Sequence, residues 1–171
     1  MSDNHKNIKR LYWDSNVFLS AINANPERLP VINAILDDCD HGEVEIYTSV
    51  LSVTEVAFAE FEKRDRLLAP QIEAKINKLW LPPSPIRLEE LSHHIANDAR
   101  IMMRQAVEKG WSLKPPDAIH LATAKRRAVH EFQTYDTDRL SKYDAVVGLK
   151  IVQPTSDRLP FSPSAGGNSG R

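Results

Sequence analysis

IKRLYWDSNVFLSAIN, residues 8–23, is the stretch that decides the fold. Ile8 to Trp13 has the apolar content of a short buried strand, and Asn16 to Asn23 has the pattern of a helix, with Ser15 available to cap it. Asp14 therefore lies where a strand passes into a helix. An acid at that point is either a helix cap or part of a site at the end of the strand.

The same order of strand and then helix repeats along the chain. Further strands are predicted over residues 44–47, 86–88, 132–134 and 149–152. Further helices are predicted over residues 26–39, 50–63, 70–80, 89–109 and 117–128. Thr48 and Ser49 are the expected cap of the second of these helices, which carries Glu55, and Pro115 and Pro116 precede the last, which opens with Asp117.

Alternating strands and helices imply parallel pairing, right-handed crossovers and helices on both faces of a sheet. We therefore expect a three-layer α/β/α fold with a central, mainly parallel sheet of four to five strands, within one domain over residues 1–153. Residues 154–171 are rich in Pro, Ser and Gly, so they are predicted to be a tail that is disordered from Ser162 onward. In such sheets the functional site lies beyond the carboxyl ends of the strands.

Composition excludes several classes of protein. Cys39 is the single cysteine, so neither a disulfide within the chain nor a zinc site of several thiolates can form, and a reducing cytoplasm is favoured. No stretch approaches the roughly 20 apolar residues of a membrane-spanning helix, and the first residues are polar, so neither export nor membrane insertion is predicted. Because the formal net charge is -1, any binding of nucleic acid must be local.

Four acids occupy positions that this fold would bring to one edge of the sheet: Asp14, Glu55, Asp117 and Asp136. Clustered carboxylates repel one another and need protons or cations to neutralise them. Oxygen ligands without imidazole or thiolate select hard ions, so Mg2+ or Mn2+ is the expected cofactor. A cation held in this way can activate water and stabilise a leaving alkoxide, which points to hydrolysis of phosphate esters.

Each acid also has an ordinary structural interpretation when it is taken alone. Asp14 and Asp117 adjoin helix starts, where an acid often only satisfies free N–H groups. Glu55 is compatible with a solvated helix position, and Asp136 is compatible with a turn stabilised by its own side chains. The site prediction therefore depends on the four acids together.

The joint pattern resembles the PIN domain (PilT N-terminus) family. The matching stretches are LYWDSNVFL, YTSVLSVTEV, PPDAIHLATA and FQTYDTD, in the family's order and between about Ile8 and Val152. The resemblance implies a Mg2+- or Mn2+-dependent ribonuclease that acts on RNA and is frequently a homodimer. Many bacterial members are VapC-type toxins, silenced by a cognate antitoxin.

By this resemblance, Asp14, Glu55, Asp117 and Asp136 are the metal-binding acids and Asp138 is an auxiliary acid. The resemblance also implies that Asn16 and Thr134 orient these carboxylates. Two departures from the family pattern are a longer segment over residues 61–85 and the Pro115-Pro116 pair before the third acid.

Other residues have two interpretations each. His120 lies on nearly the same helix face as Asp117, either as a general base or, preferably, as a histidine hydrogen-bonded beneath the site. Trp111 either stacks an unpaired base or, preferably, packs in the core. Basic residues that could flank the site, with Lys114 and Arg139 as the expected RNA contacts, are Lys114, Lys125, Arg126, Arg127, Arg139 and Lys142.

The predicted function is hydrolysis of single-stranded or looped RNA by metal-activated water. The first alternative is a catalytically silent module of the same fold that binds nucleic acid or protein. The second is a phospho-accepting, receiver-like domain, which lacks support because only one acid stands at the end of the first strand. A nucleotide-binding enzyme is disfavoured because the chain has neither a GxGxxG nor a GxxxxGK[ST] motif.

Overall fold

The computed structural model describes residues 8–158, which form a five-stranded sheet in the order β3-β2-β1-β4-β5. The strands are β1 (Lys9–Trp13), β2 (Val44–Ser49), β3 (Arg87–Glu89), β4 (Glu131–Gln133) and β5 (Ile151–Val152). Every neighbouring pair is parallel, and Tyr12 of β1 lies between Tyr47 of β2 and Phe132 of β4. All five strands therefore end at the same edge of the sheet.

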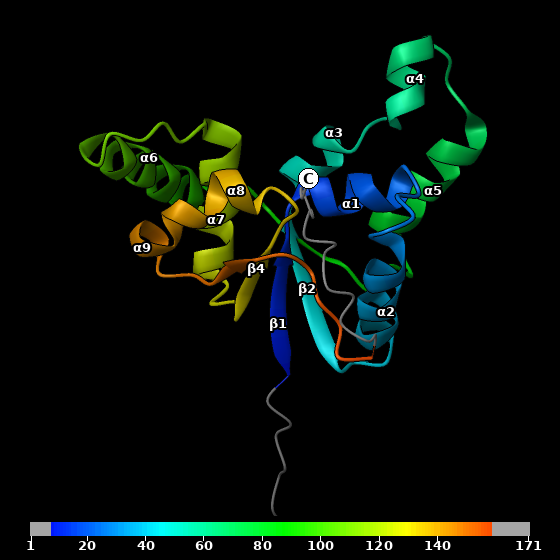
Figure 1. The fold of residues 1–171 in the computed structure, drawn as a ribbon, viewed down its shortest axis with the longest axis horizontal. Coiled ribbons are helices and arrows are strands. Elements are labelled where there is room, and N and C mark those ends of the chain that lie inside the picture. The colour runs from blue at the N-terminus through cyan, green and yellow to red at the C-terminus, as the bar shows by residue number, and fades with distance from the viewer. Residues whose placement is uncertain (1–7, 159–171) are drawn as a thin grey trace, which may run out of the picture.

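Helices cover both faces of this sheet. They are α1 (Ser15–Ile22), α2 (Leu29–Asp40), α3 (Leu51–Glu55), α4 (Glu60–Asp65), α5 (Pro70–Trp80), α6 (His93–Glu108), α7 (Pro115–Arg126), α8 (Thr137–Leu140), a 3-10 turn (Ser141–Tyr143) and α9 (Asp144–Val147). Figure 1 shows α1, α2 and α5 on one side of the sheet and α6 to α9 on the other. The predicted three-layer α/β/α fold is confirmed.

The two faces of the sheet bury separate apolar cores because successive strand residues point to opposite faces. Leu11 and Trp13 of β1 pack with α1, α2 and α5, where Trp13 meets Phe18 edge to face. Tyr12 packs on the other face with α6 and α7, and its ring stacks on Phe132. One short strand thus joins both cores and ends directly before Asp14.

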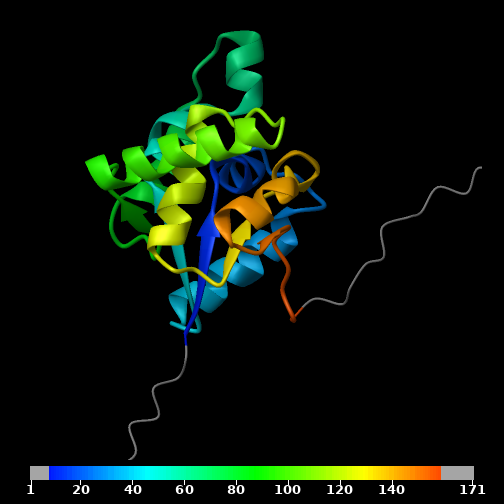
Figure 2. The same cartoon turned by 90° about the vertical axis from the view of Figure 1, so that its left-hand side faces the viewer.

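The helix predicted over residues 50–63 is wrong. Thr48 and Ser49 lie inside β2, α3 stops at Glu55, and a separate helix, α4, begins at Glu60. The buried Glu62 side chain explains the break, because it accepts hydrogen bonds from the N–H groups of Ala59 (2.9 Å) and Ala69 (2.7 Å). This carboxylate satisfies the backbone at the beginnings of α4 and α5, and both views show α4 projecting beyond the layers (Figures 1 and 2).

Smaller differences concern where elements begin. Asp14, not Ser15, occupies the cap position of α1, and the long helix α6 starts at His93 rather than Glu89. Its cap is Ser92, whose hydroxyl accepts the N–H of Ile95 (3.3 Å). Glu89 belongs to β3 instead. The short helices between residues 137 and 147 were not predicted.

The end of the described chain returns to the domain. Arg158 pairs with Asp38 and with Glu43. The residues predicted to be disordered, 162–171, lie outside the described residues, and the domain boundary at residue 153 stays a prediction. Within residues 8–158, no helix is both long enough and apolar enough to cross a membrane.

Candidate active site at the carboxyl edge of the sheet

Asp14 is the most deeply buried acid at this edge. It directly follows β1, its N–H donates to the backbone carbonyl of Gln133 (3.4 Å), and the residue is 6% exposed. One carboxylate oxygen, Oδ2, accepts the Asn16 amide (3.0 Å), whereas Oδ1 has no hydrogen-bond partner among the described residues. Burial raises the pKa of Asp14 to about 6, against hydrogen bonds from its neighbours. A buried acceptor without a donor is a position that a cation stabilises.

Asn16 connects Asp14 to the segment after β4. Its Nδ2 donates to the Thr134 hydroxyl as well (2.8 Å), and its Oδ1 accepts the N–H of Tyr135 (2.8 Å). The Thr134 hydroxyl in turn accepts the N–H of Asp136 (3.0 Å). These contacts place Asn16 and Thr134 where an orienting role requires them, although that role stays a prediction.

Glu55 is held by a buried chain of hydrogen bonds. Its Oε2 lies 2.7 Å from Nε2 of His120, whose Nδ1 lies 2.8 Å from the Tyr12 hydroxyl. That hydroxyl accepts the N–H of Ser49 (2.9 Å), so its own proton is free to go to Nδ1 while Nε2 donates to Glu55. Both ring nitrogens are occupied, which agrees with the preferred interpretation of His120 as a residue beneath the site.

These hydrogen bonds also affect the pKa of Glu55. Burial by itself raises the pKa of Glu55, but the interaction with His120, chiefly its hydrogen bond, and a hydrogen bond from Ser15 together outweigh this effect, so that the pKa is lowered overall. Glu55 is the last residue of α3, and His120 lies one turn after the start of α7. The Tyr12 hydroxyl was missed in the sequence, although one polar group in a strand of otherwise buried residues was a usable signal.

Arg139 binds two of the four acids at once. Its Nε donates to Oδ2 of Asp136 (2.6 Å), its Nη2 donates to Oδ1 of Asp117 (3.1 Å), and its Nη1 contacts the other oxygen of Asp117. The hydrogen bonds to Asp117 are the largest cause of a raised pKa of Arg139. Arg139 therefore competes with any other cation that would bind Asp117 or Asp136 through these oxygens.

The four acids thus form three hydrogen-bonded groups at one edge of the sheet. Figure 1 shows α1, α3 and α8, which carry or adjoin three of the acids, gathered beyond the carboxyl end of β1. As the side chains stand, residues 8–158 contain no group of three or more His, Cys, Asp or Glu placed to hold one metal ion. The donor atoms are nevertheless carboxylate oxygens, which suit Mg2+ or Mn2+, and Asp14 Oδ1 is available.

The other predicted residues fall into two sets. Lys114 and Asp138 are exposed near the acids, at the beginnings of α7 and α8. The basic residues Lys125, Arg126 and Arg127 lie at the far end of α7 instead, where Arg126 pairs with Asp98 and Arg127 with Glu89. These three residues therefore do not flank the site and belong to a solvated end of the helix, because a helix rises about 1.5 Å per residue and α7 leads away from Asp117.

The fold and the site together define the class of protein: a three-layer α/β domain that has a parallel sheet and brings acids from four elements to one edge of that sheet. The model of the PIN domain family matches residues 11–146. The chain belongs to the PIN domain family. Membership of this family excludes the receiver-like and nucleotide-binding alternatives.

Solved structures of similar fold include subunits of toxin-antitoxin assemblies. VapBC2 from Rickettsia felis, bound to a promoter DNA fragment, gives a TM-score of 0.63 at 14% identity over 83% of this chain and 96% of that chain. FitAcB from Neisseria gonorrhoeae gives 0.59 at 18% identity over 84% and 97%. VapC20 of Mycobacterium tuberculosis, a toxin that cleaves the sarcin-ricin loop, gives 0.57 at 14% identity over 77% and 94%. A search of curated proteins found no match.

Proposed function

We propose that this chain is a metal-dependent endoribonuclease, and that Asp14, Glu55, Asp117 and Asp136 hold Mg2+ or Mn2+. The observation that carries the proposal is the buried Asp14 carboxylate, whose Oδ1 lacks a donor at the edge where the other acids lie. The bound cation would supply Lewis acidity and an activated water for hydrolysis of the RNA backbone.

The chain's own residues have distinct parts in this proposal. Asn16 and Thr134 orient Asp14, while Tyr12 and His120 hold Glu55. Two basic residues beside the acids would bind a substrate phosphate. One is the exposed Lys114, and the other is Arg139 once it is released from Asp117 and Asp136. Asp138 is an auxiliary acid on α8.

We also propose that the chain is the toxin of a toxin-antitoxin pair, acting in the cytoplasm as a homodimer. Support comes from the fold shared with the VapBC2 and FitAcB assemblies and with the RNA-cleaving toxin VapC20. A cognate antitoxin is then the expected protein partner.

A catalytically silent PIN module is the second candidate. One observation favours it: Arg139 already pairs with both Asp117 and Asp136, so part of their negative charge is balanced without a metal ion. Cleavage assays distinguish the two candidates.

The test compares the wild type with Asp14→Asn on a mixed-sequence RNA. Cleavage by the wild type should stop in chelator and return with Mn2+ or Mg2+, and Asp14→Asn should be inactive while remaining folded. Asp40→Asn, which changes an exposed acid on α2, is the matched control and should stay active. Full activity of Asp14→Asn, or cleavage unchanged in chelator, contradicts the proposal.

A further inference from the structure

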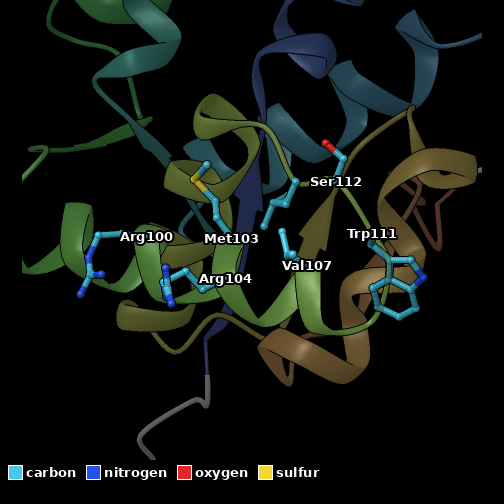
Figure 3. Close-up of a pocket in the computed structure, with 7 residues that line it drawn as sticks. Arg100, Met103, Arg104, Val107, Trp111 and Ser112 are labelled. Carbon is cyan, nitrogen blue, oxygen red and sulfur yellow. The ribbon is translucent and has the colours of Figure 1, made fainter.

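A second surface feature lies beside the site, along the carboxyl-terminal half of α6. It is an open hollow of about 410 Å³ (Figure 3). The residues that matter for its chemistry, called here the α6 groove, are Arg100, Met103, Arg104, Val107, Trp111 and Ser112. The first four come from α6 and the last two from the loop that leads to α7.

The charge of the α6 groove is entirely positive. No carboxylate lines it, and neither Arg100 nor Arg104 forms an ion pair with an acid in the described part of the chain. Among the described residues, the guanidinium of Arg100 donates a hydrogen bond to the Asn97 amide oxygen (3.3 Å), and Lys109 lies with its Nζ 5.8 Å from the centre of the Trp111 ring. Because cations left without acids favour an anionic partner, the charge is complementary to phosphate.

The lining of the groove also includes apolar side chains and an aromatic ring. Val107 is 70% exposed, and Trp111 is partly buried against Tyr143, which it meets edge to face with the rings 5.8 Å apart. Figure 3 shows the Trp111 ring at one end of the groove and the two arginines toward the other. Basic groups and an aromatic ring along one groove are the combination used to bind single strands, whose bases stack and whose phosphates pair with basic groups.

Tyr143 connects the α6 groove to the acids. Its hydroxyl donates to the carbonyl of Ser112 (2.7 Å), and the charges of Asp117 and Arg139 act on its pKa, which burial raises. The loop that carries Trp111 and Ser112 leads directly into α7, whose first turn contains Asp117.

We propose that the α6 groove binds the single-stranded RNA that flanks the cleaved phosphate, with backbone phosphates on Arg100 and Arg104 and a base on Trp111. This inference rests on the proposed ribonuclease function. Arg100 and Arg104 lie one helical turn apart, about 6 Å along the axis, so both face the same stretch of strand. The near-neutral chain concentrates its RNA affinity in this local surface.

The test measures RNA binding without cleavage, in chelator, for Arg100→Ala/Arg104→Ala. The matched control is Lys75→Ala/Lys78→Ala, which removes two exposed charges from α5 on the other side of the sheet. Each phosphate contact to a single strand contributes about 0.7 to the slope of log affinity against log salt. The groove variant should lower the slope by about 1.4, and the control should leave it unchanged.

Tryptophan fluorescence tests the aromatic end. Quenching by single-stranded RNA should be lost in Trp111→Phe and kept in Trp80→Phe, with circular dichroism used to verify that both variants are folded. Trp80 packs against Phe18 in the opposite core and serves as the control ring.

Equal salt slopes for the two double variants overturn the inference. The inference is also overturned if the groove variant changes its oligomeric state but still binds RNA, because the surface would then be a protein interface. The two proposals can fail separately. If the wild type shows metal-dependent cleavage but the groove variant has an unchanged salt slope, only RNA binding by the α6 groove is contradicted. If the groove variant has a lower slope but the wild type does not cleave RNA, only the ribonuclease function is contradicted.

Discussion

Among single residues, Asp14 has the clearest energetic consequence. Its pKa is about 6 in the folded protein against 3.8 for the free side chain, because burial disfavours the charged form. The folded state thus binds this proton more tightly than the unfolded state, and the stability that the proton provides is lost as the pH rises from about 4 through 6.

Asp14→Asn removes the buried charge and keeps an oxygen for Asn16. In chelator at pH 7, the variant should have a free energy of unfolding higher than the wild type by roughly 1–3 kcal/mol, since one pKa unit is worth about 1.4 kcal/mol. Below about pH 3 the two proteins should be equally stable, because Asp14 is then protonated in both states. Denaturant titrations at several pH values measure this, and a less stable variant at pH 7 contradicts it.

Arg139 competes with metal ions for Asp117 and Asp136. Arg139→Gln should therefore bind Mn2+ more tightly in calorimetry, roughly tenfold, which is equivalent to about 1.4 kcal/mol. Lys142→Ala is the control, because Lys142 lies over the Tyr143 ring (5.3 Å), and within residues 8–158 the ion pairs of both acids are with Arg139. Weaker Mn2+ binding by Arg139→Gln would show that the guanidinium supports the site rather than occupying it.

At the scale of elements, the Tyr12 hydroxyl ties β1 to β2 and to α7. Tyr12→Phe leaves the buried N–H of Ser49 without an acceptor and His120 without a donor, so stability should fall by about 1–3 kcal/mol. The Tyr47 hydroxyl donates to the partly exposed Glu45, so Tyr47→Phe should lower the free energy of unfolding by less than about 1 kcal/mol. Thermal unfolding compares the two variants, and equal losses contradict a special role for Tyr12.

The elements also differ in how well their sequence predicted them. Apolar spacing predicted α5 closely, because it buries one stripe that includes Ile72 and Ile76. The Pro115-Pro116 pair predicted the start of α7, which is buried on most of its sides. The break between α3 and α4 depends on both a local and a more distant contact of Glu62. Its carboxylate accepts the N–H of Ala59, three residues before it, and also the N–H of Ala69, seven residues after it, a contact that exists only once α5 has folded back.

For the whole molecule, the expected consequence of metal binding is added stability. If the acids bind Mn2+ only when the chain is folded, a metal concentration 100 times the dissociation constant should stabilise the wild type by about 2.7 kcal/mol, and excess chelator should reverse this. Asp14→Asn should show a clearly smaller gain, whereas Asp40→Asn should match the wild type. The absence of any Mn2+-dependent shift in the wild type contradicts a metal site in this domain.

The sequence by itself determined the three-layer architecture, the parallel sheet and the positions of the four acids along the chain. Periodicity and strand ends depend on local patterns, which a single chain displays directly. Only the tertiary structure decided how Glu55 and Asp117 are partnered: His120 reaches Glu55, and Arg139 joins Asp117 to Asp136. Pairing at this edge depends on side chains that meet across a fold of five strands, and no spacing along the chain specifies which cation or donor reaches which carboxylate.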